Sequence, residues 1–482
     1  MLAVAHVLGT MTACFGLLYL LPIAWSLAAR DGLAGVFFAA MSINAVVGLG
    51  LAAATRRFRR ELKPRDGFIL VTLSWTLMSL SAVVPLMLAI PGLSFTDAYF
   101  EAASGLTTTG ATVLNDLQHL PPSLNLWRHT MHWIGGIGII VLALAVLPLL
   151  GVGGMQLYKA SMPGPVKDEK LTPRITETAK ALWFTYLVLT AVSILLLRMA
   201  GMSWLDAVCH AFSAISLGGF STQDTSVAAY NSVTIELILI VIMLVGACNF
   251  SRHFLAMRSL SLRPYAHDSE GKAVMVLLST SVLFATVLLW LQGAYPDFGT
   301  SLRHAAFSVV SIATTAGFVT ENYELWPAFL PVWLIFLSCI TCSTGSTGGG
   351  IKMFRTLLLV RHARRELKLL VHPSAVVPIR IGGQVVPDRI VYSVLAFIFL
   401  YFITILVLTF AMLATGLDLV SSFSAIVSSV NNMGPALGAV GPATNFSALS
   451  DAQTWICSVA MLVGRLEIFA VVVLFTATFW RK

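Results

Sequence analysis

Ten stretches of mostly apolar residues, each about 20 residues or longer, recur along the whole chain and limit its possible folds. A helix needs about 20 such residues to cross the hydrocarbon core of a bilayer. The stretches lie near residues 2–28, 34–54, 68–91, 123–150, 178–200, 232–251, 273–294, 326–350, 389–416 and 452–480. Only 11% of the 482 residues are charged, against about 25% in a typical soluble domain. We therefore predict an all-α polytopic membrane protein.

The basic residues are divided unevenly between the two sides that these spans define. Of the 30 lysines and arginines, 25 lie in segments 56–65, 159–180, 252–272, 352–389 and 481–482. All five segments follow even-numbered spans, so the positive-inside rule predicts that they and both termini are cytoplasmic. The opposite side carries 12 acidic and four basic residues. An acidic outer face concentrates cations, although ordinary solvated loop charge explains the same pattern.

Four segments between spans are too short to cross the membrane and too apolar for ordinary loops. They read LSFTDAYFEAASGLTTTGAT, SWLDAVCHAFSAISLGGFST, SLRHAAFSVVSIATTAGFVT and LVSSFSAIVSSVNNMGPALG. We aligned them on one glycine each: Gly110, Gly219, Gly317 and Gly434. A serine then lies six residues upstream in every copy: Ser104, Ser213, Ser311 and Ser428. The match predicts four copies of one unit, in which a short helix runs into a glycine-bearing turn.

We predict a two-helix preface followed by four such units. The preface covers 1–66, and the units cover 67–157, 158–262, 263–368 and 369–482. Each unit is a helix, a re-entrant pore loop and a second helix, and each begins and ends in the cytoplasm. Such parallel repeats differ from the inverted repeats of many carriers. They can close around an axis normal to the membrane, which gives one polypeptide pseudo-fourfold symmetry around one pore.

The residue types in these loops suit a cation pathway. Non-helical backbone survives at membrane depth only where protein or a water-filled path surrounds it, and a ring of carbonyls can replace the hydration shell of an ion. Glycine accepts the positive φ angles that point successive carbonyls to one side. The preceding short helix directs its partial negative end at the pore centre. One loop alone is equally consistent with an interfacial hairpin, whereas four matched copies favour a pore.

Several motifs in and beside the loops are family-specific. They are SGLTTTGAT at 104–112, LGGFST at 217–222, TTAGF at 314–318, NNMGP ending at Pro435, STGSTGGGIK at 343–352 and GRLEI at 464–468. Together they resemble the TrkH/KtrB/HKT superfamily of cation channels and transporters, and most closely its bacterial TrkH branch, over the whole chain. The resemblance implies potassium uptake across the bacterial inner membrane through a carbonyl-lined selectivity filter.

The resemblance also implies which carbonyls bind potassium. They belong to the residues just before and at each glycine: Thr108, Thr109, Gly110, Leu217, Gly218, Gly219, Thr315, Ala316, Gly317, Asn432, Met433 and Gly434. Family members with serine at the first glycine position tend towards sodium, so Gly110 favours potassium. Leu217 and Met433 stand in place of threonine, so we expect looser selectivity than in homotetrameric potassium channels. A sodium-permeable or H⁺- or Na⁺-coupled symporter of the same fold is the alternative.

The eighth span contains a run of serine, threonine and glycine that is unsuited to a stable membrane helix. The run extends from Ser343 to Gly350, and Lys352 follows it. We predict a flexible gating loop at 343–350, with Gly345, Ser346, Thr347, Gly348, Gly349, Gly350 and Lys352 as gating residues. A nucleotide-binding P-loop fits poorly, because Ile351 separates Gly350 from the lysine and the flanks are membrane helix rather than strand.

Arg465 lies in the last span beside Glu467. Charges inside a membrane usually face a cavity or a charged partner. A structural ion pair between the two residues is one interpretation. The family resemblance implies another, in which Arg465 lies in the pore below the filter, near the 343–350 loop. There its positive charge opposes potassium until the gate rearranges.

Partners follow from the resemblance alone. TrkH-like proteins are usually homodimers that dock a cytosolic ring of nucleotide-binding subunits resembling TrkA, so NAD or ATP would act only through that partner. The basic segments 159–180 and 361–368 are candidate docking surfaces, although positive-inside charge explains them equally well. The net charge of +8 follows from the inner loops and indicates no nucleic-acid partner. No catalytic or metal-ligand constellation is found, so we predict a transporter rather than an enzyme, with no covalent cofactor.

Overall fold

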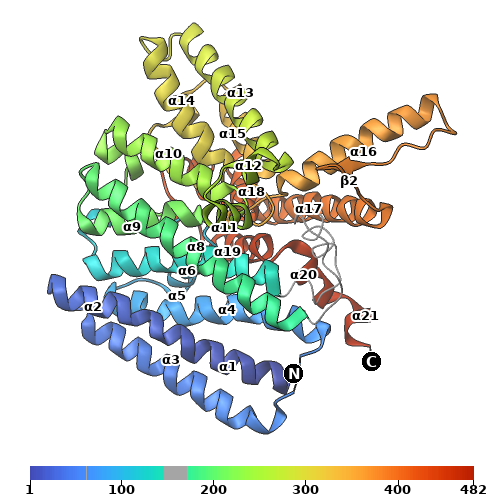
Figure 1. Ribbon diagram of the computed structural model, residues 1–482. Coiled ribbons are helices and arrows are strands. Elements are labelled where there is room, and N and C mark those ends of the chain that lie inside the picture. Colours follow the sequence, from blue (N-terminus) through green and yellow to red (C-terminus); the bar gives the residue numbers. More distant parts are fainter. Residues whose placement is uncertain (61, 146–170, 482) are drawn as a thin grey trace.

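The computed structural model describes residues 1–60, 62–145 and 171–481 (Figure 1). Most of these residues are helical, as predicted, and β1 (Arg380–Ile381) and β2 (Gln384–Val385) form one short antiparallel hairpin. Parts of the predicted features lie outside the described residues: most of the basic segment 159–180, the boundary at residue 157, the end of the 123–150 span, and Lys482. The division into five segments stays a prediction.

The first helices form a layer along one edge of the molecule, coloured blue in Figure 1. They are α1 (Leu2–Gly16), a 3₁₀ turn η1 (Leu17–Tyr19), α2 (Leu20–Ala29), α3 (Ala34–Thr55) and η2 (Arg56–Phe58). Helices α1 and α3 pack closely because Gly9 and Gly48 face each other. A Cβ atom built at Gly9 would lie 2.7 Å from the carbonyl oxygen of Gly48, which is the small-residue packing expected between membrane helices.

The remaining elements repeat one pattern four times. The first copy contains α4 (Pro64–Ala89), α5 (Phe95–Leu106), η3 (Leu117–His119) and α6 (Pro122–Ala145). The second contains α8 (Leu171–Met199), α9 (Trp204–Ser216), η4 (Ser226–Tyr230), α10 (Val233–Ala247) and α11 (Phe250–Ser259). In both, a long outer helix, a short pore helix and an inner helix follow one another.

The third and fourth copies follow the same order. The third contains α12 (Arg263–Ala266), α13 (Ser269–Leu291), α14 (Phe298–Ala313), η5 (Tyr323–Leu325), α15 (Phe329–Ile340) and α16 (Met353–Val371). The fourth contains α17 (Asp388–Ala414), α18 (Leu419–Asn431), η6 (Gly438–Val440), η7 (Phe446–Ala448), α19 (Asp451–Arg465), α20 (Ile468–Val472), η8 (Val473–Phe475) and α21 (Ala477–Trp480).

Packing between these copies closes a ring. Inner helix α6 of the first copy packs against pore helix α9 of the second, and α10 of the second packs against α14 of the third. Helix α15 then packs against α18, and α19 of the fourth copy returns to α5 of the first. Each inner helix therefore covers the pore helix of the next copy, and the last contact joins the end of the cycle to its beginning. This is the pseudo-fourfold arrangement predicted from the parallel repeats.

Six described helices are long and apolar enough to cross a membrane, and two bent helix pairs raise the number to eight. Three of the ten predicted spans are not continuous helices, and only the interruption within 326–350 was expected from the sequence. The 232–251 span bends by 101° between α10 and α11, and the 452–480 span bends by 109° between α19 and α20. Within the 326–350 span, helix α15 already ends at Ile340. All three breaks fall in inner helices, where the ring leaves space for non-helical backbone.

Candidate ion pathway

Four short pore helices lead into the glycine loops. Helices α5, α9, α14 and α18 contain 12, 13, 16 and 13 residues, too few to cross a bilayer. Each begins at a side-chain N-cap: Ser94, Ser203, Asp297 and Asp418. Hydrogen bonds from Thr300 hold the pKa of the Asp297 carboxyl below its usual value, and those from Ser421 do the same for Asp418. Each helix C-terminus, with its partial negative charge, adjoins the loop that follows it.

The four loops share one backbone conformation. The residue two positions before each glycine is left-handed: φ is 52° at Thr108, 56° at Leu217, 61° at Thr315 and 53° at Asn432. The glycines have φ of 80° at Gly110, 79° at Gly219, 76° at Gly317 and 98° at Gly434. The residue between has negative φ in every loop. Alternating signs of φ along such a segment turn successive carbonyls to the same side, and non-glycine residues adopt positive φ only under constraint.

Contacts between neighbouring loops close a second, smaller ring inside the helix ring. A Cβ built at Gly110 would lie 1.9 Å from the Gly218 carbonyl oxygen, and one at Gly219 would lie 2.1 Å from that of Ala316. A Cβ at Gly317 would lie 2.1 Å from the Met433 oxygen, and one at Gly434 would lie 2.7 Å from that of Thr109. Each glycine thus faces the carbonyl that precedes the next glycine. Any side chain at these positions would push the ring apart.

The upstream serine that marked the repeats holds each loop through its backbone. The carbonyl of that serine accepts the amide of the residue before the glycine in all four copies. The bonds are Thr109 to Ser104 (2.9 Å), Gly218 to Ser213 (2.8 Å), Ala316 to Ser311 (2.9 Å) and Met433 to Ser428 (2.9 Å). The six-residue spacing therefore reflects one repeated turn. All four glycines also line a single cavity on the side of the loops that follow them, together with Asp224, Asn445 and other residues of those loops.

The predicted gating segment lies directly against the other side of the filter loops. The chain is non-helical from Thr341 to Lys352, slightly longer than the predicted 343–350. The Gly349 amide donates to the Thr315 hydroxyl at 3.0 Å. The Thr347 hydroxyl donates to the Ile215 carbonyl at 3.0 Å. A Cβ at Gly349 would lie 1.8 Å from the Asn431 carbonyl oxygen. The segment is thus tied to three of the four copies, whereas the sequence predicted a flexible loop.

Arg465 reaches this segment from the end of α19. Its Nη1 donates to the Thr347 carbonyl at 2.8 Å, and its Nη2 donates to the Gly135 carbonyl at 3.0 Å. The side chain is buried. Glu467 pairs instead with Arg355, at 2.8 Å, so the interpretation of a structural ion pair between Arg465 and Glu467 is wrong. The chain turns sharply after Arg465, and this turn separates the two side chains.

Lys352 ends the segment and begins α16. Its Nζ donates to the carbonyl of Gly348, so it folds back on the loop. The preceding element is helix α15 and the following one is helix α16, which excludes the strand-to-helix context of a nucleotide P-loop. Among the described residues, no group of His, Cys, Asp and Glu could hold a metal ion.

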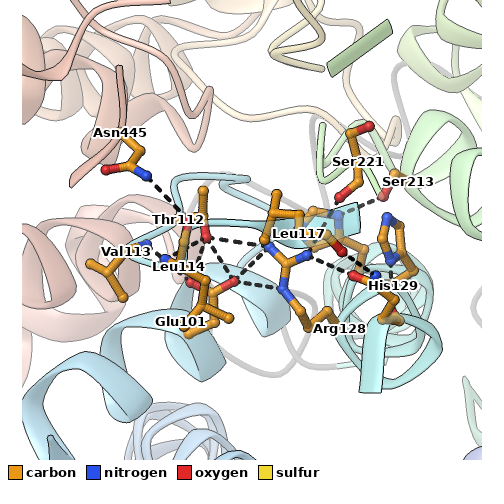
Figure 2. A network of polar contacts seen from close by, with 12 residues as sticks. Glu101, Thr112, Val113, Leu114, Leu117, Arg128, His129, Ser213, Ser221 and Asn445 are labelled. Atoms are coloured by element: carbon orange, nitrogen blue, oxygen red, sulfur yellow. Dashed lines mark hydrogen bonds and ion pairs between the residues drawn. The ribbon is translucent and has the colours of Figure 1, made fainter. Parts of the chain in front are cut away.

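Sequence reasoning missed a polar network behind the outer side of the filter (Figure 2). Glu101 on α5 and Arg128 on α6 form a fully buried ion pair with an N–O distance of 2.7 Å. In the sequence, both were counted only as outer-face charges. The available signal was their position: each lies within an apolar helix of a membrane protein, where an ionisable side chain is expensive and usually functional.

Comparison with known proteins identifies the family. The family model described as "TrkH: Cation transport protein" matches residues 34–482. This chain belongs to the TrkH family. It is 44% identical to the Trk system potassium uptake protein TrkH of Salmonella typhimurium over 481 residues, covering 100% of this chain and 99% of that protein. It is 37% identical to the Trk system potassium uptake protein TrkG of Escherichia coli, covering 99% and 98%.

A solved TrkH-family structure has the same fold over the whole chain. The crystal structure of the potassium transporter TrkH from Vibrio parahaemolyticus matches with a TM-score of 0.92 and 41% sequence identity. The match covers 100% of this chain and 99% of that one. The predicted family and the predicted all-α polytopic fold are therefore confirmed.

Proposed function

We propose that this chain carries potassium across the bacterial inner membrane through the ring formed by its four glycine loops. The observation that carries the proposal is the closed cycle of glycine–carbonyl contacts from Gly110 through Gly219, Gly317 and Gly434 back to the first loop. Carbonyl rings of this kind replace the hydration shell of a potassium ion. The names of the relatives, potassium uptake proteins of the Trk system, support the same ion.

The ion-binding oxygens in this proposal are the backbone carbonyls of the 12 filter residues. They are Thr108, Thr109, Gly110, Leu217, Gly218, Gly219, Thr315, Ala316, Gly317, Asn432, Met433 and Gly434. Backbone, and not side chain, supplies the ligands, so Leu217 and Met433 are compatible with a filter despite their apolar side chains. Four pore-helix C-termini add partial negative charge, which favours a cation over an anion.

The proposal is tested by flux in proteoliposomes that contain the purified chain. We expect passive, saturable uptake of K⁺ and Rb⁺ with Na⁺ largely excluded, and no dependence on a proton gradient. Uptake that requires a proton or sodium gradient would identify the coupled symporter instead. Gly110→Ser is the paired variant and is expected to raise the ratio of Na⁺ to Rb⁺ uptake. Failure of the wild-type gene to restore growth of an uptake-deficient bacterium at low potassium, with the protein in the membrane, contradicts the proposal.

Gating forms the second part of the proposal. Segment 343–350 obstructs the path beneath the filter, and Arg465 keeps it closed through its hydrogen bonds to Thr347 and Gly135. Its positive charge also opposes a cation in the pore. Gly345, Ser346, Gly348, Gly349 and Gly350 supply the backbone freedom for the segment to move, and Lys352 anchors its end through the Gly348 carbonyl.

Replacing Arg465 tests the gate. Arg465→Ala should raise basal Rb⁺ flux by about tenfold, equivalent to ~1.4 kcal/mol of lost closure, because both the charge and the two hydrogen bonds disappear. Arg465→Lys keeps the charge without the planar fork that reaches two carbonyls, and should give an intermediate flux. Membrane yield and the size-exclusion profile control for folding. Flux equal to or below wild type in Arg465→Ala would overturn this part.

Assembly is the least direct part of the proposal. We propose a homodimer with both termini cytoplasmic, regulated by a cytosolic nucleotide-binding subunit resembling TrkA through the basic residues 361–368 of α16. These residues are mostly half-buried or exposed, which is compatible with docking. Light scattering in detergent tests the dimer. Co-purification with and without charge reversal of Arg361 and Arg364 tests the docking surface. A monomer, or unchanged binding by the reversed variant, contradicts the respective claim.

A further inference from the structure

We infer that the buried Glu101–Arg128 ion pair is a positioning device for the filter, which holds the outgoing strands of the first two loops in register and so sets discrimination between K⁺ and Na⁺. This inference rests on the proposed function of the filter. The outgoing strand of a loop is the run of residues just after its glycine. All four glycines line one cavity beside these strands. Figure 2 shows the ion pair between these strands.

Glu101 holds the outgoing strand of the first loop. Its carboxylate accepts the Thr112 hydroxyl at 2.9 Å and the Val113 amide at 3.2 Å. Thr112 and Val113 follow Gly110 by two and three residues. The Thr112 carbonyl in turn accepts the amide of Phe446, from the fourth copy, at 2.9 Å. One carboxylate therefore fixes where the first loop leaves the filter and where the fourth copy meets it.

Arg128 connects Glu101 to the second loop. Its Nε donates to Glu101 at 2.7 Å, and its Nη1 donates to the Ser221 carbonyl at 3.4 Å and to the Asn125 side chain at 3.2 Å. The guanidinium lies over the ring of Phe220, 4.3 Å from its centroid. Phe220 and Ser221 directly follow Gly219. The planar guanidinium has donors in several directions, which is what a bridge between two strands needs.

Positioning explains this pair better than stability does. Taking two charges out of water is unfavourable, and apolar residues of similar size often stabilise a fold as well or better. Both side chains are fully buried, and nearly every partner belongs to a filter loop or its flank. A second ion pair, Glu236–Arg303 at 2.7 Å, joins helices α10 and α14 of neighbouring copies, and Arg303 also donates to the Asn231 side chain. Within the described part of the chain, its hydrogen bonds reach no outgoing strand, so it serves as the control.

The experiment compares three variants with wild type in proteoliposomes. Glu101→Gln keeps the size and the acceptor oxygen but loses the charge. The double variant Glu101→Gln with Arg128→Met removes both charges, so that no charge is left buried without its partner. Glu236→Gln is the control. The readout is the ratio of Na⁺ to Rb⁺ uptake, which a merely structural role would not change in protein that folds normally.

We expect the Na⁺ to Rb⁺ ratio to rise about tenfold in Glu101→Gln and in the double variant. This factor corresponds to the loss of one hydrogen bond to a charged group. Glu236→Gln should keep the wild-type ratio. A wild-type ratio retained by the folded double variant would overturn the inference. If wild type itself does not discriminate between the ions, the proposed filter fails instead, so the two failures are distinguishable.

A field effect at the pore mouth makes a different prediction. If Glu101 acted by attracting cations, Glu101→Gln would raise the half-saturating Rb⁺ concentration at low ionic strength, and the double variant, which also loses the positive charge, would return it towards the wild-type value. A positioning role predicts that both variants lose selectivity in the same direction. Such shifts in half-saturation with unchanged selectivity would therefore also overturn the inference.

Discussion

The first two filter loops and the last two share a backbone but are supported by different side chains. In the first two, the residue nine positions before the glycine reaches the hydroxyl two positions after it. Glu101 accepts from Thr112 at 2.9 Å, and His210 bonds Ser221 at 3.0 Å. In the last two, the upstream serine hydroxyl donates directly to the strand. Ser311 donates to the Phe318 carbonyl and Ser428 to the Gly434 carbonyl, both at 2.7 Å.

The difference extends to the outer ends of the pore helices. Serine caps α5 and α9, whereas aspartate caps α14 and α18. A pore made from four identical chains cannot differ in this way, because each change appears four times. A single chain has no such restriction. The four copies therefore share the backbone conformation of the ring. The side chains that support this conformation differ between the first two copies and the last two.

Alanine substitution of the loop glycines should have the largest effect, and it tests whether both pairs of loops depend on the same backbone ring. A Cβ at Gly219 would lie 2.1 Å from a backbone oxygen that cannot rotate away, whereas one at Gly434 would lie 2.7 Å from its nearest oxygen. Gly219→Ala should lower Rb⁺ flux by about 100-fold and Gly434→Ala by about tenfold, corresponding to ~2.7 and ~1.4 kcal/mol. Flux per purified protein is the measurement. Wild-type flux in either variant would break the claim of four equivalent loops.

Removing the upstream serine hydroxyls should have a moderate effect that differs between the two pairs of loops. Ser428→Ala removes a hydrogen bond to the Gly434 carbonyl, worth about 1 kcal/mol, and should weaken K⁺ over Na⁺ discrimination by about fivefold. Ser104→Ala is the counterpart in the first loop, where the hydroxyl has no partner among the described residues, and should leave discrimination unchanged. Uptake competition between Rb⁺ and Na⁺ measures both. Equal effects of the two variants would remove the distinction between the pairs.

The smallest effect concerns the helix caps. The pKa of Asp297 and of Asp418 is lowered in the folded protein, so each ionised cap contributes stability that is complete above pH about 4. The contribution is lost as the pH falls through the lowered folded value. Asp297→Ala should therefore destabilise the protein at pH 7 and do so by less near pH 3.

Thermal unfolding of wild type and of Asp297→Ala in detergent at the two pH values provides the measurement. A destabilisation by Asp297→Ala that grows on acidification would contradict the assigned sign, because a cap that is protonated in both states has nothing left to lose. Wild type at both pH values controls for any general effect of acid on the micelle or on the rest of the protein.

Much of the architecture could be predicted because it depends on local patterns. Apolar length gave the spans, charge bias suggested their orientation, and the spacing between Ser104 and Gly110 recurred because one turn geometry recurs. The breaks after Ala247 and Arg465 could not be predicted in this way. An apolar run reads the same whether the helix continues or bends, and the bends depend on contacts with other copies.

In the candidate site, too, features with a local sequence pattern could be predicted and contacts between distant segments could not. Spacing identified the four glycines and the serine upstream of each, and the family resemblance implied the neighbouring carbonyls. Their role as potassium ligands stays a prediction. The partners of Arg465 were not found, because Thr347 and Gly135 contribute carbonyl oxygens that every residue possesses. Glu101 and Arg128 are visible as unusual charges, yet their pairing joins positions 27 residues apart on two helices. Only the packing of α5 against α6 brings them together.

The contacts around Thr347 have a consequence for how the pathway opens. Thr347 belongs to the third copy, its hydroxyl bonds Ile215 of the second, and its carbonyl accepts from Arg465 of the fourth. Arg465 then reaches Gly135 of the first. Thr347 and Arg465 therefore connect residues of all four copies through three hydrogen bonds. In the proposed gate, a movement of any one copy would strain contacts with the other three, so a signal that arrives at one copy would act on all four.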